Sequence, residues 1–160
     1  MMKTIVLIGL SVILGMGIGG IFIGRKMVGI IYNKQFDVEK FRKMYHMIQR
    51  WMATKQEGKF LETYFEKNKY QRIAIYGMAD IGVLLINELK DTAIEVVYGI
   101  DKNHFLRSAV PLYHPDQELL EVDAVVVTAI AYFDSIEKML SEKLSCPILS
   151  LEDVIYELLD

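Results

Sequence analysis

The residues with the clearest chemical potential lie in a stretch that ends in a glycine turn. It reads Arg72-Ile-Ala-Ile-Tyr-Gly-Met-Ala-Asp-Ile-Gly82, an apolar run followed by the pattern Gly77-x-Ala79-x-x-Gly82. A glycine turn between a strand and a helix is where doubly wound α/β domains bind the phosphates of a nucleotide, because backbone N–H groups face the ligand there. We therefore expect Gly77, Met78, Ala79 and Gly82 to lie on the phosphate side of a binding site.

Two residues of this turn disfavour the binding of a phosphate. The dinucleotide fingerprint has glycine at its middle position, where Ala79 adds a methyl group that narrows the approach of the ligand. Asp80 places a carboxylate in the first turn of the helix, which stabilises an empty helix N-terminus and repels an anion. Phosphate binding is therefore conditional on the direction of the Asp80 side chain.

Two further residues are expected at the same crevice. Asp101 follows the apolar run 94–100 and comes 19 residues after Gly82, where an acid accepts hydrogen bonds from ribose hydroxyls and disfavours a 2′-phosphate. NAD-like ligands are then preferred over NADP-like ones. The alternative is that Asp101 only begins a turn, Asp-Lys-Asn, and both interpretations stay open. Thr128, at the end of the run 122–128, lies beside the first strand if the strand order reverses there, and Tyr132 follows in the same loop.

No catalytic constellation is visible in the sequence. There is no Ser–His–Asp group and there are no paired histidines at metal-ligand spacing. The single cysteine, Cys146, is expected to be a small buried hydrophobic residue. We predict no catalytic residue and no metal ligand, and an enzyme only if a partner subunit completes the site.

The elements that must position these residues alternate between short apolar runs and segments of helical period. Strands are expected at 71–76, 94–100, 109–113, 122–128 and 147–149, and helices at 80–90, 133–144 and 151–159, the last capped by Ser150. This alternation predicts an α/β fold with a five-stranded, mostly parallel, Rossmann-like sheet over residues 70–160. Only about eight residues join the second and third strands, so a loop is expected there instead of a helix.

A basic amphipathic helical connector is expected at 27–69. Residues 25–72 hold 12 Lys/Arg and 5 Asp/Glu, whereas residues 73–160 hold 5 and 16, so nucleic acid is a poor partner for the acidic half. Asp37 is expected to cap a helix that ends near Thr54, Gly58 to break it, and Asn68 to end a second helix over 59–67. The apolar residues of one helix face are Phe41, Met44, Tyr45, Ile48, Trp51 and Met52.

Three interpretations of this connector stay open. Its basic face could lie on anionic lipid, with Trp51 at the interface. It could pack on a helix of a partner. It could also form a helical hairpin that packs on the α/β domain.

Residues 4–24 form an uncharged run of 21 residues, long enough to cross the hydrocarbon core of a membrane. We predict a signal anchor over residues 1–26. Because Arg25 and Lys26 follow the run, the rest of the chain is expected on the cytoplasmic side of the cell membrane, with a single pass. Ser11, Gly15 and Gly19 share one helical stripe of small residues, which favours helix association with a second copy or another protein.

Several segments resemble the small Rossmann-like domains of bacterial polysaccharide-biosynthesis proteins, including the N-terminal nucleotide-binding part of nucleotide-sugar dehydratases and sugar acetyltransferases. The resemblance covers about residues 70–158 and is carried by IAIYGMADIG, GIDKN, VPLYHPDQELLEVDAVVVTAI and ILSLEDVI. It implies a nucleotide-binding role for Gly77, Ala79, Gly82 and Asp101, with NAD or a nucleotide-sugar as ligand. It also implies a place in surface glycan assembly, with a glycan-assembly protein as partner.

The expected function is a membrane-tethered, cytoplasmic nucleotide- or dinucleotide-binding accessory module. One alternative is a scaffold that keeps the fold, has no ligand and binds a membrane or glycan-assembly partner. A second alternative is an NAD-dependent oxidoreductase or epimerase-type enzyme completed by a partner subunit.

Overall fold

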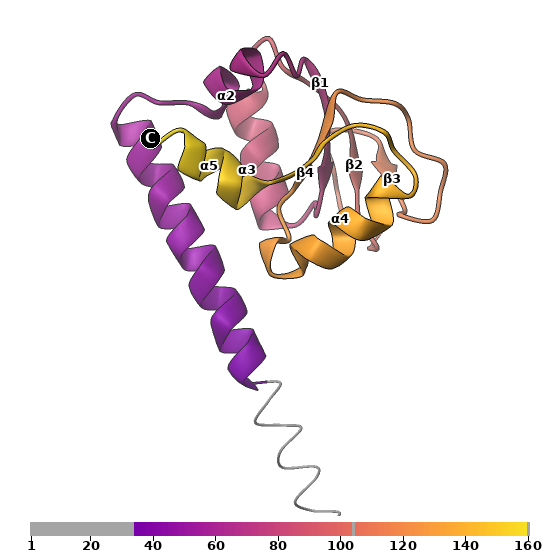
Figure 1. Cartoon of the computed structure of the whole chain (residues 1–160), viewed down its shortest axis with the longest axis horizontal. Helices are drawn as coiled ribbons and strands as arrows, with labels where there is room; N and C mark the ends of the chain where they lie inside the picture. Colours follow the sequence, from indigo (N-terminus) through magenta and orange to yellow (C-terminus); the bar gives the residue numbers. More distant parts are fainter. Residues whose placement is uncertain (1–33, 104, 160) are drawn as a thin grey trace, which may run out of the picture. The chain divides into compact units, whose positions relative to one another are not determined.

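The computed structural model describes residues 34–103 and 105–159 (Figure 1). The predicted anchor over residues 4–24, and with it the stripe of Ser11, Gly15 and Gly19, lies outside the described residues. Within the described part of the chain, no helix is both long and apolar enough to span a membrane. The chain divides into two compact units, Met1–Arg42 and Lys43–Asp160.

The second unit is built on a five-stranded sheet in which every pair of neighbouring strands is parallel. The strand order is β3-β2-β1-β4-β5, so the order reverses between β1 and β4. The α/β prediction and the five strands are confirmed. The strands are β1 (Arg72–Tyr76), β2 (Glu95–Ile100), β3 (Leu112–Tyr113), β4 (Ala124–Val127) and β5 (Ile148–Ser150).

Helices cover both faces of the sheet, which is why the central strands β1 and β4 are apolar along nearly their whole length. One face packs against the 43–56 segment, α2 (Leu61–Lys67), α3 (Asp80–Leu89) and α5 (Leu151–Glu157). The other face packs against α4 (Phe133–Ser141) and residues 119–122. Figure 1 shows α4 apart from α3 and α5, as this division requires.

The basic connector takes part in the core. Residues 34–56 are helical, and Met47, Trp51 and Thr54 are buried on the side that faces the sheet layer. The prediction of a helical hairpin packed on the α/β domain is therefore confirmed, and a lipid-interface position for Trp51 is wrong, because only 5 % of this residue is exposed. The contacts place the start of this compact unit at Lys43, before the start at residue 70 expected from the sequence.

Several element ends differ from the sequence prediction. Asp37 is wrong as a helix cap, since the chain is already helical from residue 34. Ser150 stands at the N-cap position of α5, but its hydroxyl makes no capping hydrogen bond, so the predicted cap is wrong. Gly58 does break the helix, with φ +76°, and Asn68 ends α2 by donating from Nδ2 to the Tyr64 carbonyl at 2.9 Å.

The connection from β2 to β3 contains no helix in its described residues, as expected from its length. The edge strand is shorter than predicted, with only Leu112 and Tyr113 paired to β2.

Candidate functional site

The glycine turn lies directly after β1 and requires glycine at two positions. Gly77 has φ +93°, and a Cβ atom on it would lie 2.5 Å from Thr128 Oγ1. A Cβ atom on Gly82 would overlap the carbonyl oxygen of Gly77, so α3 approaches the turn as closely as glycine permits. The predicted structural roles of both residues, the tight turn and the close helix packing, are confirmed.

Asp101 lies next to this turn and is hydrogen bonded to it. Its Oδ2 accepts from the backbone N–H of Met78 at 2.8 Å, and its Oδ1 accepts from the N–H of Asn103 at 2.8 Å. The second bond closes the Asp-Lys-Asn turn, so that interpretation is confirmed. Each carboxylate oxygen keeps acceptor capacity for another donor. Binding of a ribose at Asp101 therefore stays a prediction that this geometry permits.

The charge of Asp101 also acts on the end of β1. The pKa of Tyr76 is raised, first because the residue is buried and second because the Asp101 carboxylate opposes a phenolate. Tyr76 therefore remains a neutral phenol beside the turn at physiological pH.

Thr128 ties the loop after β4 to the glycine turn. It is only 8 % exposed, its N–H donates to the Tyr76 carbonyl at 2.9 Å, and its Oγ1 lies 2.7 Å from the Gly77 carbonyl oxygen. The structure thus brings Gly77, Met78, Asp101 and Thr128 together at the point where the strand order reverses. Tyr132 follows in a 3₁₀ turn (η1, Ile130–Tyr132) and is 43 % exposed.

The N-terminus of α3 completes the turn. Ala79 stands at the N-cap position without a side-chain capping bond, and both Ala79 and Asp80 are exposed. The Asp80 carboxylate in the first turn already balances the positive end of the helix dipole. Ribose hydroxyls would find an acceptor in Asp101, whereas a phosphate at this helix end would meet the negative charge of Asp80.

Sequence reasoning missed the partner of the Met78 side chain. Met78 is only 1 % exposed, and a Cβ atom on Gly99 would lie 2.5 Å from Met78 Sδ. Met78 therefore offers its N–H to Asp101 while its side chain packs over the glycine of β2. The available signal was Gly99 itself, since a glycine inside an apolar strand often marks the close approach of another group.

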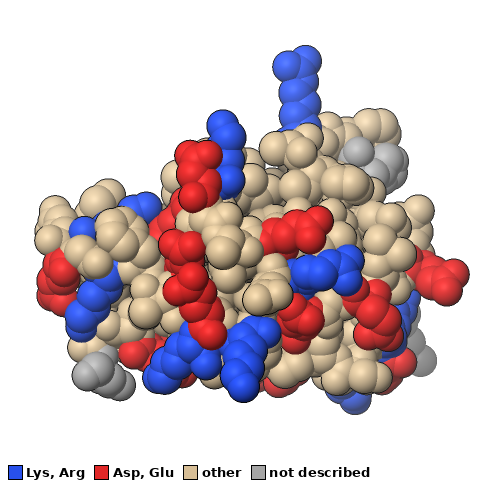
Figure 2. Space-filling view, turned by 90° about the horizontal axis from the view of Figure 1, so that it is seen from above, with Lys and Arg blue, Asp and Glu red and all other residues tan. Residues whose placement is uncertain are grey.

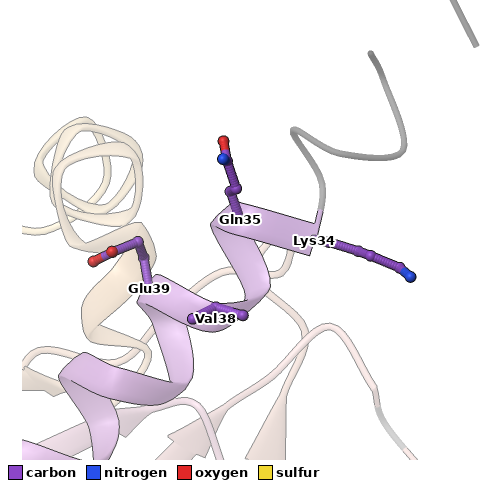
Figure 3. A pocket seen from close by; sticks show the side chains of 4 residues that line it. All are labelled: Lys34, Gln35, Val38 and Glu39. Atoms are coloured by element: carbon purple, nitrogen blue, oxygen red, sulfur yellow. The ribbon is translucent and has the colours of Figure 1, made fainter. Parts of the chain in front are cut away.

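A surface hollow exists elsewhere, in the Met1–Arg42 unit. It is lined by Lys34, Gln35, Val38 and Glu39, and Figure 3 shows that these side chains come from one helical segment and point away from one another. None of them was predicted as a site residue. A hollow with this lining does not enclose a small ligand.

The surface charges are mixed on the face seen in Figure 2, where Lys/Arg and Asp/Glu side chains alternate without a large patch of one sign.

Comparisons of the chain with protein families, with curated proteins and with solved structures gave no match. The candidate site therefore rests on the geometry of the glycine turn, Asp101 and Thr128.

Proposed function

We propose that this protein is a non-catalytic module that binds a dinucleotide or a nucleotide-sugar at the crevice between β1 and β4. The observation that carries the proposal is the position of Asp101, whose carboxylate is hydrogen bonded to the glycine turn at the carboxyl ends of the strands. In open α/β sheets, ligands bind in the crevice outside these strand ends, where the strand order reverses.

The chemistry expected at this site is recognition. Ribose hydroxyls donate to the free acceptor positions of Asp101, and the negative charge disfavours a 2′-phosphate, so NAD is preferred over NADP. The first N–H groups of α3 lack acceptors within the helix and are the donors available to a phosphate. Ala79 and Asp80 weaken that contact, which places more of the binding on the ribose.

The cellular setting is part of the proposal. The uncharged run 4–24 would hold the α/β unit at the cytoplasmic face of the cell membrane. The resemblance to polysaccharide-biosynthesis proteins supports a role beside glycan-assembly enzymes, to which the module would report or present a nucleotide. The candidate residues would bind the ligand, and none of them is proposed as a catalytic acid or base. An oxidoreductase would therefore need a partner subunit to supply its acid, base and substrate contacts.

A second candidate function is a scaffold without a ligand. It is favoured by the internal hydrogen bonds of the crevice, since both oxygens of Asp101 accept from backbone N–H groups and the Thr128 hydroxyl lies 2.7 Å from the Gly77 carbonyl oxygen. A turn that is complete in this way folds without a nucleotide. The protein would then act through another surface.

A ligand titration separates the two candidates. The full-length chain in detergent is heated with NAD, NADP or nucleotide-sugars, and a ligand at 100 times its dissociation constant should stabilise the folded protein by about 2.7 kcal/mol. Asp101→Asn should then weaken NAD binding at least about tenfold, because one acceptor oxygen becomes an amide donor.

The matched control is Asp123→Asn. Asp123 also accepts two backbone N–H bonds, from Gln71 at 2.8 Å and Arg72 at 2.7 Å, but at the amino end of β1. It should cost comparable stability and leave ligand affinity unchanged. No thermal shift with any of the ligands would favour the scaffold, and equal affinities of Asp101→Asn and the unmodified chain would remove the ribose assignment.

A further inference from the structure

Tyr76 is the last residue of β1, and the strands on both sides hold it in place. Its partners in the sheet register are Ile100 of β2 and Val127 of β4, and both are fully buried. Its carbonyl accepts from the Thr128 N–H at 2.9 Å. The residue is only 6 % exposed and packs in the core cluster on the α4 face of the sheet. The Tyr76 ring therefore has a fixed position at the carboxyl end of β1.

The hydroxyl of Tyr76 has different surroundings from the ring. Within the described part of the chain, the hydrogen bonds of Tyr76 are made by its backbone, and none is made by its hydroxyl. Every buried side-chain nitrogen or oxygen atom of the described residues has a hydrogen-bond partner. The Tyr76 hydroxyl must therefore reach the surface at its tip. A buried tyrosine usually has a partner for its O–H group, and here a molecule at the strand ends is the partner available.

Asp101 is the charged group beside this hydroxyl. It directly follows Ile100, the register partner of Tyr76, and its carboxylate is close enough to oppose a phenolate and raise the pKa of Tyr76. The oxygens of Asp101 accept from the backbone N–H groups of Met78 and Asn103, not from the Tyr76 hydroxyl. A neutral phenol, which donates, thus lies near a carboxylate, which only accepts.

We propose that the Tyr76 hydroxyl and the Asp101 carboxylate bind the same ribose of the ligand. Each hydroxyl of a ribose donates one hydrogen bond and accepts others, so the sugar donates to Asp101 while it accepts from Tyr76. This inference rests on the proposed function and names the group that the crevice recognises, a ribose with both of its hydroxyls unmodified. Because the ring of Tyr76 is already fixed, the contact requires little ordering of the side chain on binding.

Tyr64 on α2 is the internal comparison for Tyr76. It is 8 % exposed, and its hydroxyl also makes no hydrogen bond within the described residues. Burial first, and the charge of Glu157 second, raise its pKa, so it too is a neutral phenol. Tyr64 packs in the core cluster on the opposite face of the sheet, and α2 leads into the amino end of β1. The two tyrosines therefore differ in their position in the sheet and not in their burial.

Tyr76→Phe tests the contact, because it removes the hydroxyl and keeps the ring. NAD and UDP-glucose, which both carry an unmodified ribose, are titrated into the full-length chain in detergent. Tyr76→Phe should raise the dissociation constant of the nucleotide that binds about fivefold, as expected for loss of one hydrogen bond between neutral groups. Tyr64→Phe is the matched control and should leave this constant unchanged. Circular dichroism should show both variants folded.

Ligand analogues identify the group that Tyr76 contacts. Two analogues of the bound nucleotide are used, one without the 2′-hydroxyl and one without the 3′-hydroxyl of the nucleoside ribose (the adenosine ribose in NAD). Tyr76→Phe should leave the dissociation constant of one of them unchanged, because that analogue has already lost the acceptor. Weakening by the same factor for the nucleotide and for both analogues would overturn the proposal.

The same titrations separate this proposal from the proposed function. If Asp101→Asn weakens binding and Tyr76→Phe binds as tightly as the unmodified chain, the crevice binds a nucleotide and the Tyr76 contact is refuted. If neither NAD nor UDP-glucose binds the unmodified chain, the proposed function fails, and the contact of Tyr76 with a ribose fails with it.

Discussion

Replacement of Glu88 should detach the 43–56 helical segment from the α/β unit. Glu88 lies on α3, and its side chain is only 5 % exposed. Its Oε2 accepts from Trp51 Nε1 at 2.7 Å and from Lys55 Nζ at 2.8 Å, while its Oε1 accepts from the Leu61 N–H at 3.1 Å. One carboxylate therefore joins α3, the long helix and the first residue of α2.

The stability lost in Glu88→Ala follows from the hydrogen-bond donors that lose their acceptor. The indole N–H of the buried Trp51 and the N–H of Leu61 each lose an acceptor, and hydrogen bonds to a charged group are worth about 1.5–3 kcal/mol each. The Lys55 contact adds little, because that side chain is 39 % exposed and its charge returns to water. We expect a loss of about 3–5 kcal/mol in the free energy of unfolding, in the range for breaking a buried charged contact. Glu88→Gln should cost less than Glu88→Ala, since the glutamine carbonyl oxygen can still accept some of the hydrogen bonds that the carboxylate accepts.

Urea unfolding of the full-length chain measures this loss, and Trp51 serves as the probe because it is the only tryptophan of the chain. In Glu88→Ala its emission should move toward that of exposed indole at lower urea than circular dichroism reports for the sheet. Glu157→Ala is the control, since Glu157 pairs with Lys67 at 3.0 Å on an exposed surface, and it should cost less than about 1 kcal/mol. If Glu88→Ala and Glu157→Ala lose equal stability, the assignment of Glu88 as the joint between these elements is refuted.

Two further predictions concern a glycine and a tyrosine. Gly77→Ala should lower the free energy of unfolding by about 2–3 kcal/mol, because a left-handed residue is strained and its Cβ would lie 2.5 Å from Thr128 Oγ1. Gly58 also has a positive φ, +76°, but a Cβ atom on it would have no atom within 4 Å, so Gly58→Ala should cost only about 1 kcal/mol. If urea unfolding gives equal losses of stability for Gly77→Ala and Gly58→Ala, the predicted clash with Thr128 is contradicted. Burial raises the pKa of Tyr98 from 10.0 to about 12, and its hydroxyl donates to the Leu120 carbonyl at 2.6 Å. Because the folded-state pKa is the higher one, this contribution, up to about 2.7 kcal/mol, is complete below pH 10 and is lost between pH 10 and 12. Tyr98→Phe should lose stability less steeply than the unmodified chain when urea midpoints at pH 9 and 11.5 are compared.

The apolar runs of the sequence predicted the number of strands and their parallel arrangement because the central strands are covered on both faces. Element ends were less predictable, since they depend on pairing. The edge strand predicted at 109–113 shrinks to Leu112 and Tyr113, where β2 offers only Gly99 and Ile100 as partners. The helix predicted to reach Leu144 ends at Ser141. Leu144 is still buried, because its side chain packs in the same cluster as Ile136 and Leu140, and its N–H donates to the Leu140 carbonyl at 2.9 Å.

The connector shows where periodicity alone is insufficient. The sequence placed Tyr45, Trp51 and Met52 on one face, but the structure divides them, with Trp51 in the core and the other two exposed. Adjacent residues on a helix differ by about 100°, so only part of a broad apolar face can reach the core. The acceptor that draws Trp51 inward, Glu88, lies 37 residues away along the chain, and no local pattern identifies it.

For the candidate site, the sequence predicted the positions of the residues but not their roles. Glycines and an acid at strand ends indicated where Gly77 and Asp101 would lie. Asp101 binds backbone N–H groups of the turn, and residue type alone does not separate this role from ligand binding. Asp123 provides the comparison inside the same sheet, because it also binds two backbone N–H groups, at the strand ends where α/β sheets do not bind ligands. If the acid at the crevice serves folding alone, asparagine at either position should have the same effect on every measurement. A loss of nucleotide affinity at Asp101 and none at Asp123, at comparable stability, assigns the difference to the crevice itself.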